Sequence, residues 1–482
     1  MRHVLAGAAV ALGIAAAAPA FADDGASLEA RLARAEQELA ASSSPSAREI
    51  QSAVDAYLAS GKADAALVGG PGEAGYDGGF WIRGGSFLLK TNLTLQTRYE
   101  YWDWDQRSVE PSPGGDLSGF SVPRATLRLS GDATCDVHYY VALEFGHPGS
   151  LHDNEVNRNT ESNFFIDSNG DPINHAADAG NTLREGWIEY GVCTAFAARM
   201  GLVQTPNTRQ MMTPPELQQF VDISLASVFT GLFMPGYTDR NRDYGLLLHG
   251  AFLCDQQLSY MLSVTNGDGP ASHNVVDGTT NDNLAYGARL NYDIKGHMGY
   301  EEGALRQSTC GWVASVGAWA YVYHDTLTDN PHQSLATRTL WGLDAAFGWG
   351  GFSFTAAYTD ITLDNSDFTP ATVNSYSYLV QAGYLLPNTS WEIAARYSGY
   401  QQKYEQVGGA TFGAAEIAGA VTYYVDGHAD KLTLDVAFVQ GEDDGNIVAD
   451  AYAGYNAGIK SNQNGTFTSD GMLVRFQWQL AL

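Results

Sequence analysis

The hydrophobic pattern of the chain repeats every second residue from about residue 85 to the end. Segment 471–482 is the clearest case, because apolar residues alternate there with Arg475, Gln477 and Gln479. A period of two predicts β-strands with one apolar and one polar face. The strands exceed the ~5–6 residues of ordinary strands, which disfavours the alternatives of a soluble β-sandwich or a secreted β-helix. The pattern therefore predicts an all-β, antiparallel transmembrane β-barrel.

The period-two region divides into sixteen predicted strands. Their ranges are 86–104, 120–131, 136–147, 182–192, 195–204, 242–252, 256–266, 283–294, 310–325, 337–348, 352–363, 374–386, 390–402, 412–425, 431–442 and 471–482. Short connections alternate with long ones, as in outer-membrane barrels, whose periplasmic turns are short. Connection 295–309 is the exception, since it is long although it lies on the side of the short turns.

The first 84 residues follow other patterns. Residues 1–22 predict a signal peptide, with a polar start, an apolar run and Ala20-Phe21-Ala22 before the cleavage point. Residues 23–60 predict a short periplasmic helical segment, whose heptad seam from Leu28 to Leu39 would suit either a coiled coil or a frayed amphipathic helix without a partner. Residues 61–84 are rich in Gly, Ala and Asp and predict a flexible linker before the barrel, 85–482.

The charge of the chain limits its partners. A formal net charge of -28 excludes nucleic acid, whose phosphates need Lys and Arg. After the signal peptide no segment reaches the ~20 apolar residues of a transmembrane helix. We therefore expect insertion by strands into the bacterial outer membrane, in contact with lipid and lipopolysaccharide. Acidic residues between 153 and 178 would either be solvated or bind divalent cations that bridge lipopolysaccharide.

Five short segments resemble the phosphate-selective porin O/P family. They are VPRATLRL (122–129), REGWIEY (184–190), RMGLVQTP (199–206), RDYGLLLHG (242–250) and SVTNG (263–267). The resemblance covers roughly 85–482 and implies a sixteen-stranded homotrimeric barrel, often with a short N-terminal coiled coil. It also implies that a long loop, here 205–241, folds into the lumen as a constriction. Phosphate-specific members line the pore with arginines and lysines.

Strand parity predicts which charged side chains face the lumen. If the apolar faces meet lipid, one contiguous basic sector and three further arginines point inward: Lys90, Arg98, Arg124, Arg128 and Arg475, then Arg199, Arg289 and Arg396. Such a wall favours passive diffusion of anions such as phosphate. Acids of the same parity leave open a general, weakly selective porin, because they would pair with these cations: Glu100, Glu144, Asp344, Glu392 and Asp435.

The four cysteines all lie at or beside predicted periplasmic turns. The oxidising periplasm permits disulfides, and Cys135–Cys193 with Cys254–Cys310 is one of the three possible pairings. The sequence has no CxxC spacing, and we expect no metal and no cofactor.

Three classes of function remain open for such a barrel. No GxSxG, HExxH or phosphate-cradling motif occurs, so we do not expect an enzyme, although barrel enzymes of the outer membrane exist. A structural or adhesive barrel with long acidic loops is the other alternative. The loop 205–241 is unusually apolar from Leu225 to Met234, which predicts burial inside the barrel or at a subunit contact.

Overall fold

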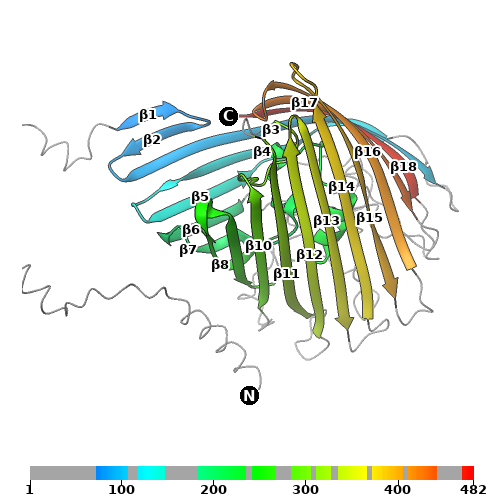
Figure 1. The fold of residues 1–482 in the computed structure, drawn as a ribbon, viewed down its shortest axis with the longest axis horizontal. Coiled ribbons are helices and arrows are strands. Elements are labelled where there is room, and N and C mark those ends of the chain that lie inside the picture. Colours follow the sequence, from blue (N-terminus) through cyan, green and yellow to red (C-terminus); the bar gives the residue numbers. More distant parts are fainter. Residues whose placement is uncertain are drawn as a thin grey trace, which may run out of the picture. The chain divides into compact units, whose positions relative to one another are not determined.

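Sixteen antiparallel strands close into a barrel in the computed structural model of the chain (Figure 1). The structure describes residues 72–106, 117–146, 183–234, 241–267, 284–305, 311–326, 335–365, 372–404, 411–441 and 469–482. They belong to the unit Gly72–Leu482. The predicted signal peptide, helical segment and acidic stretch 153–178 lie outside the described residues.

Each strand of the barrel pairs with its neighbours in sequence, and the last strand closes on the first. The strands are β3 (Phe87–Gln106), β4 (Leu117–Asp132), β5 (Val137–Glu144), β6 (Leu183–Cys193), β7 (Phe196–Gln204), β8 (Arg242–Phe252), β9 (Leu258–Thr265), β10 (Ala285–Lys295), β11 (Val313–Thr326), β12 (Leu335–Trp349), β13 (Phe352–Asn365), β14 (Thr372–Leu385), β15 (Trp391–Tyr404), β16 (Thr411–Asp426), β17 (Asp430–Gly441) and β18 (Ser469–Ala481). Closure is antiparallel, with Arg475 opposite Glu100. All sixteen predicted strands are confirmed.

The linker predicted over 61–84 is wrong at its C-terminal end, where two more strands form a hairpin. β1 (Glu73–Tyr76) pairs with β2 (Phe80–Gly84), and β2 pairs with the first residues of β3. β18 pairs with β3 only from Thr94 onward, and the backbone of Leu482 bonds with that of Leu93. The hairpin therefore pairs with the first residues of β3, which extend beyond the end of β18.

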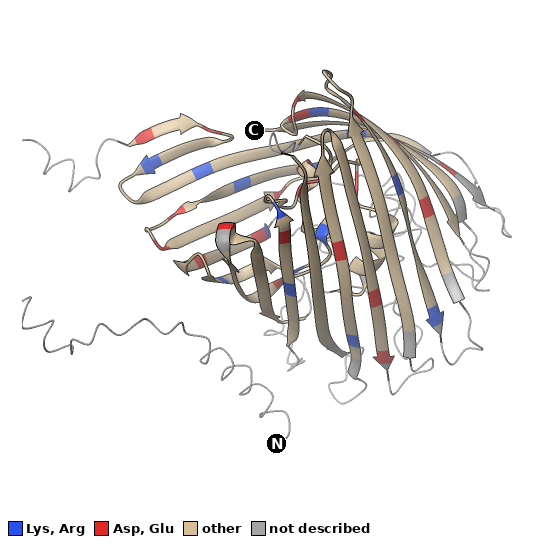
Figure 2. Ribbon diagram, viewed as in Figure 1, with Lys and Arg blue, Asp and Glu red and all other residues tan. Residues whose placement is uncertain are grey.

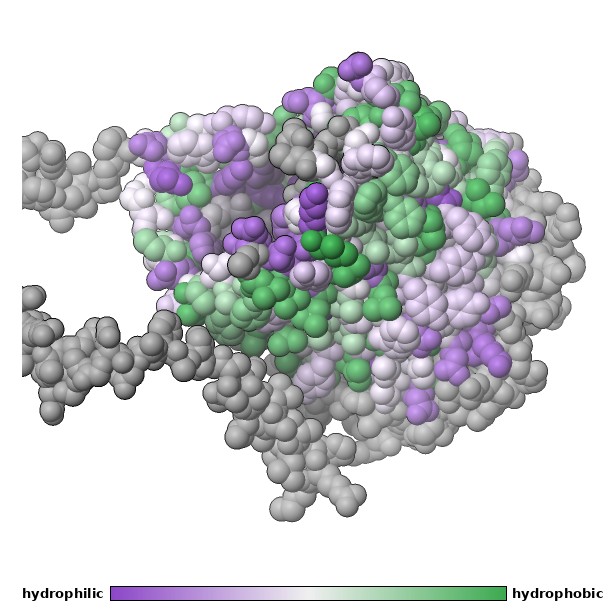
Figure 3. Space-filling model, viewed as in Figure 1, coloured by the Kyte–Doolittle hydropathy of each residue, from purple (hydrophilic) through white to green (hydrophobic). Residues whose placement is uncertain are grey.

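The outer face of the barrel is apolar and its inner face polar. On β14, Tyr376 and Tyr384 are exposed near opposite ends, whereas Ser375, Ser377 and Gln381 are buried. Figure 3 shows apolar side chains gathered over the strands of one outer face. Aromatic side chains at both ends of such a wall are typical of strands that cross a membrane. Among the described helices, none is long and apolar enough to span a bilayer.

Residues 205–234, the described part of the connection between β7 and β8, lie inside the barrel, where loop 205–241 is expected. We call residues 205–234 the inner loop. It contains α5 (Arg209–Met212), the 3₁₀ turn η1 (Pro215–Leu217) and α6 (Leu225–Leu232). The side chain of Ser224 accepts a hydrogen bond from the backbone N–H of Ser227, which caps α6.

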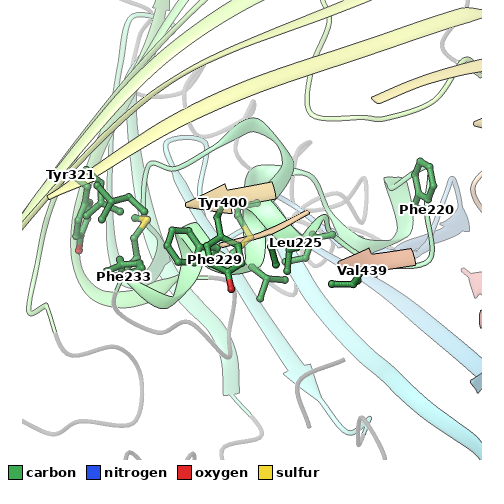
Figure 4. Packing of buried hydrophobic residues seen from close by; sticks show 14 of the residues in the cluster. Phe220, Leu225, Phe229, Phe233, Tyr321, Tyr400 and Val439 are labelled. Carbon is green, nitrogen blue, oxygen red and sulfur yellow. The ribbon is translucent and has the colours of Figure 1, made fainter. Parts of the chain in front are cut away.

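The apolar side of the inner loop packs against the barrel wall (Figure 4). Phe229 is fully buried and stacks on Tyr400 of β15, with 4.1 Å between ring centroids. Phe233 contacts Phe229 edge-on. Burial inside the barrel therefore accounts for the apolar stretch, and a subunit contact is not needed to explain these side chains.

Candidate functional site in the lumen

The arginines predicted to face inward have their side chains inside the barrel. Five of them are almost fully buried: Arg98 (4%), Arg124 (6%), Arg289 (2%), Arg396 (2%) and Arg475 (0%). Arg128 and Arg199 keep 17% and 21% of their side-chain surface exposed. Lys90 differs, because it lies against the Gly78–Gly79 turn of the β1–β2 hairpin at the end of the barrel.

The basic sector on β18, β3 and β4 is contiguous, as expected, but the inner loop neutralises much of it. Asp222 accepts hydrogen bonds from Arg124 at 3.1 Å and from Arg98 at 3.4 Å. Arg128 donates to Glu216 at 2.9 Å. The carboxylates come from the loop and the guanidinium groups from the wall, so these ion pairs dock the loop on the sector.

A second set of ion pairs is dry. Arg289 forms a two-pronged pair with Asp344, at 2.7 and 2.8 Å. Arg396 pairs with Glu416, and Arg475 pairs with Asp435. These side chains are at most 1% exposed, and all three pairs lie within β10–β18. We call them the dry pairs.

A third set keeps contact with water and lies along β4–β8. Its members are Arg128–Glu216, Arg184–Glu144, Arg199–Glu189 and Arg242–Glu185, with 9–21% of each side chain exposed. We call them the wet pairs. The Arg199 guanidinium also lies 3.7 Å from the centre of the Trp187 ring, which stacks with Tyr140. Figure 2 shows basic and acidic positions interspersed over the strands.

The inward acids behave as the alternative predicted, with one exception. Glu100, Glu144, Asp344 and Asp435 each pair with an arginine. Glu392 instead accepts hydrogen bonds from Gln219 and from the backbone N–H of Ala304.

Several charged residues of the lumen were not predicted. Arg184 is skipped where the β5–β6 ladder is irregular, so strand parity does not apply to it. Arg242 begins β8, and Asp222 and Glu216 lie in the inner loop, which has no period of two. The family-like segment REGWIEY was the available signal for Arg184, Glu185 and Glu189.

The cysteine pairing between Cys135 and Cys193 is not formed. Both thiols are free and exposed, although the backbone N–H of Gly191 bonds to Asp136 and brings the two turns together. The β6–β7 ladder is irregular between Gly191 and Cys193, which displaces Cys193 from its regular place. The side chain of Cys254 and all of Cys310 lie outside the described part of the chain.

One titratable group lies half-buried in a short turn of the barrel. His428 lies in the turn between β16 and β17, beside the Nζ of Lys431 at 3.2 Å. Burial, together with the positive charge of Lys431, lowers the pKa of His428 below its ordinary value. The described residues contain no group of three or more side chains suited to a metal ion.

Comparison with known proteins establishes the fold of this chain. No protein-family model and no curated protein sequence matches it. It is similar to the anion-selective porin from Comamonas acidovorans, with a TM-score of 0.50 and 12% identity over 81% of this chain and 99% of that one. OprB of Pseudomonas putida gives a TM-score of 0.49 and 11% identity over 81% and 94% of the two chains. OmpF of Salmonella typhi gives a TM-score of 0.48 and 12% identity over 85% of this chain and 100% of that one.

The chain thus has the fold of a porin-type outer-membrane barrel. At this identity the likeness concerns the fold alone. The resemblance to the phosphate-selective porin O/P family stays a prediction.

Proposed function

We propose that this chain is a passive porin of the bacterial outer membrane, with a water-filled passage between the inner loop and strands β4–β8. The observation that carries the proposal is the contrast between the wet and the dry pairs. The side chains of the four wet pairs keep 9–21% of their surface, whereas those of the dry pairs within β10–β18 keep at most 1%. Charged groups that keep water contact inside a barrel mark the side along which hydrophilic solutes can pass.

Weak selectivity follows from the same ion pairs. In each of the four wet pairs one arginine is offset by one carboxylate, so these side chains sum to no net charge. A preference for anions such as phosphate needs guanidinium groups that can turn to the solute, and here they already bind carboxylates. General diffusion of small hydrophilic solutes is therefore the function we favour, with the anion channel as its finer alternative.

Export, assembly and the absence of catalysis belong to the same proposal. A signal peptide over 1–22, a periplasmic helical segment, a homotrimer and contacts with lipopolysaccharide all fit a porin. Passive diffusion needs no cofactor and no catalytic group.

Single-channel recording in a planar bilayer tests the proposal. We expect stepwise conductance, a reversal potential close to zero in a KCl gradient, and no block when phosphate is titrated in. Strong anion selectivity with block by phosphate would replace general diffusion by a phosphate channel. If correctly folded protein gives no conductance, a structural or adhesive role is the function that remains.

Glu216→Gln should shift the reversal potential toward anions. The substitution leaves Arg128 without its carboxylate at a position where both partners are 17% exposed, so the guanidinium becomes available to passing anions. Reversal potentials in a KCl gradient measure the shift. Glu73→Gln makes the same charge change on the exposed strand β1 and serves as the control. Equal shifts in both variants would show that Arg128 does not line the passage.

A further inference from the structure

A second segment enters the barrel, from the end opposite to the inner loop. It joins β10 to β11, the one connection on the short-turn side that is long in sequence. We call its described part, 296–305, the inner turn. Met298 and Ala304 are each 4% exposed, and Met298 packs on Val313 and Ala346 of the wall. The inner turn is thus built into the lumen.

The inner turn and the inner loop meet at Glu302. The backbone N–H of Glu302 donates to the carbonyl oxygen of Leu217 at 3.0 Å. Its carboxylate Oε1 accepts from Gln210 Nε2 at 2.9 Å. The other oxygen, Oε2, accepts from the backbone N–H of Gln219 at 3.1 Å and from Gln381 Nε2 of β14 at 3.0 Å. One side chain therefore joins the inner loop, the inner turn and the wall.

The joint is dry and its donors are neutral. Glu302 is 4% exposed, and Gln210 and Gln219 are each 2% exposed. A buried carboxylate needs all of its donors, because each missing hydrogen bond leaves charge unsatisfied in a low dielectric. Each oxygen of the Glu302 carboxylate accepts at least one hydrogen bond from the three amide donors, which are Gln210 Nε2, the backbone N–H of Gln219 and Gln381 Nε2. An amide in place of the carboxylate cannot reproduce this pattern, since its NH₂ would face another NH₂.

Other contacts support the same joint without replacing it. Tyr300 accepts from Arg289 Nε at 2.9 Å, and Gln219 Nε2 also reaches Glu392 of β15. Asp222 holds the opposite side of the inner loop on the basic sector. Asp222 thus holds the inner loop on the basic sector and Glu302 holds it on the inner turn, in addition to the packing of Phe229 on the wall.

We infer that Glu302 is the positioning residue of the constriction: its carboxylate holds the inner loop on the inner turn and so sets the width of the passage. This inference rests on the proposed porin function. The side chain need not touch solute, because it acts through the inner loop. Loss of the joint should populate a state with a displaced loop and a wider passage.

An exchange of side chains across the joint tests this role. Glu302→Gln places an NH₂ against the Gln210 amide, and Gln210→Glu places a second carboxylate against Glu302. Each variant should raise the share of time in a high-conductance state by roughly tenfold or more, as loss of a hydrogen bond to a charged group predicts. The double variant Glu302→Gln with Gln210→Glu restores donor and acceptor in reversed order and leaves net charge unchanged. It should return conductance and open-channel noise toward the wild type.

The outcomes separate this inference from the porin function itself. Wild-type protein without conductance overturns the porin function. A conducting wild type with unchanged single variants, or a double variant no closer to wild type than the singles, overturns the role of Glu302. Glu73→Gln controls for charge, and heat-dependent mobility on gels verifies folding of each variant. If a single variant does not fold, recovery of folding in the double variant shows that the two side chains bond, and its wild-type-like conductance would support the role.

Discussion

Asp222→Asn is expected to raise the single-channel conductance and to make the channel anion-selective. Asp222 is the loop carboxylate that receives hydrogen bonds from Arg98 and Arg124, two arginines with 4% and 6% exposure. An asparagine has no charge, and its NH₂ repels a guanidinium. Removing one partner of a buried ion pair costs about 3–5 kcal/mol, because the other charge stays in a low dielectric.

The inner loop can relieve that cost by moving away from the wall and admitting water to the two guanidinium groups. Movement of the loop at Asp222 would break two neighbouring hydrogen bonds as well. The carbonyl oxygen of Asp222 accepts from Arg396 at 2.9 Å, and the N–H of Val221 donates to Asp435 at 3.1 Å. A displaced loop widens the passage, and hydrated arginines attract anions. Conductance steps and reversal potentials in a KCl gradient report the two effects separately.

Asp255→Asn is the matched control for this experiment. Asp255 is exposed in the turn between β8 and β9, and its φ of 56° is a conformation that asparagine adopts readily. Its net charge change equals that of Asp222→Asn. Unchanged conductance with Asp222→Asn would mean that the basic sector does not hold the loop. A shift in selectivity of the same size in both variants would mean that total charge, not the docking site, sets the preference.

The strands were predictable because their pattern is local. In 374–386, for example, alternation alone separates Tyr376 and Tyr384 from Ser375 and Ser377, and the structure buries the serines. The β1–β2 hairpin was missed because glycines at 72, 75, 78, 79, 84 and 85 hide its alternation. Gly75 has a purpose there, since a Cβ at this position would collide with the Trp81 ring.

Among the charged residues of the lumen, only those on the strands of the wall were predictable. Parity placed Arg98 and Arg124 inward, but their partner Asp222 comes from a loop whose path depends on packing inside the barrel. No sequence pattern shows which residues of such a loop lie opposite which strands. The basic sector therefore suggested an anion pathway, whereas the geometry assigns part of it to loop docking. Glu302 was not predicted either, because it lies in a turn without periodicity.

Arg396→Met should destabilise the barrel by about 3–5 kcal/mol, the usual cost of breaking a buried pair. Arg396 and Glu416 are both fully buried, and the Arg396 Nε donates to Glu416 at 2.7 Å. The substitution leaves the Glu416 carboxylate with Ser398 Oγ and the backbone N–H of Leu225, at 2.6 and 2.9 Å. Leu225 begins α6, so the same carboxylate also helps to hold the inner loop. Unfolding in urea, followed by tryptophan fluorescence, gives the free energy of unfolding.

The double variant Arg396→Met with Glu416→Met should be more stable than Arg396→Met alone. Apolar side chains of similar volume replace a buried ion pair at little net cost, whereas a lone buried carboxylate is costly. Part of the loss remains, because the N–H of Leu225 no longer has its acceptor. A double variant as unstable as the sum of the two single variants would show that the two charges do not stabilise one another.

Arg128→Met is the comparison that connects stability to the passage. Its pair with Glu216 has 17% of each side chain exposed, so water can solvate the remaining carboxylate. The loss should therefore be smaller than at Arg396 and should lie between that of an exposed pair, about 1 kcal/mol or less, and that of a fully buried one. If Arg128→Met costs as much as Arg396→Met, the wall at β4 is as dry as the wall at β15. The passage could not then run along β4–β8, although the closed barrel would be unaffected.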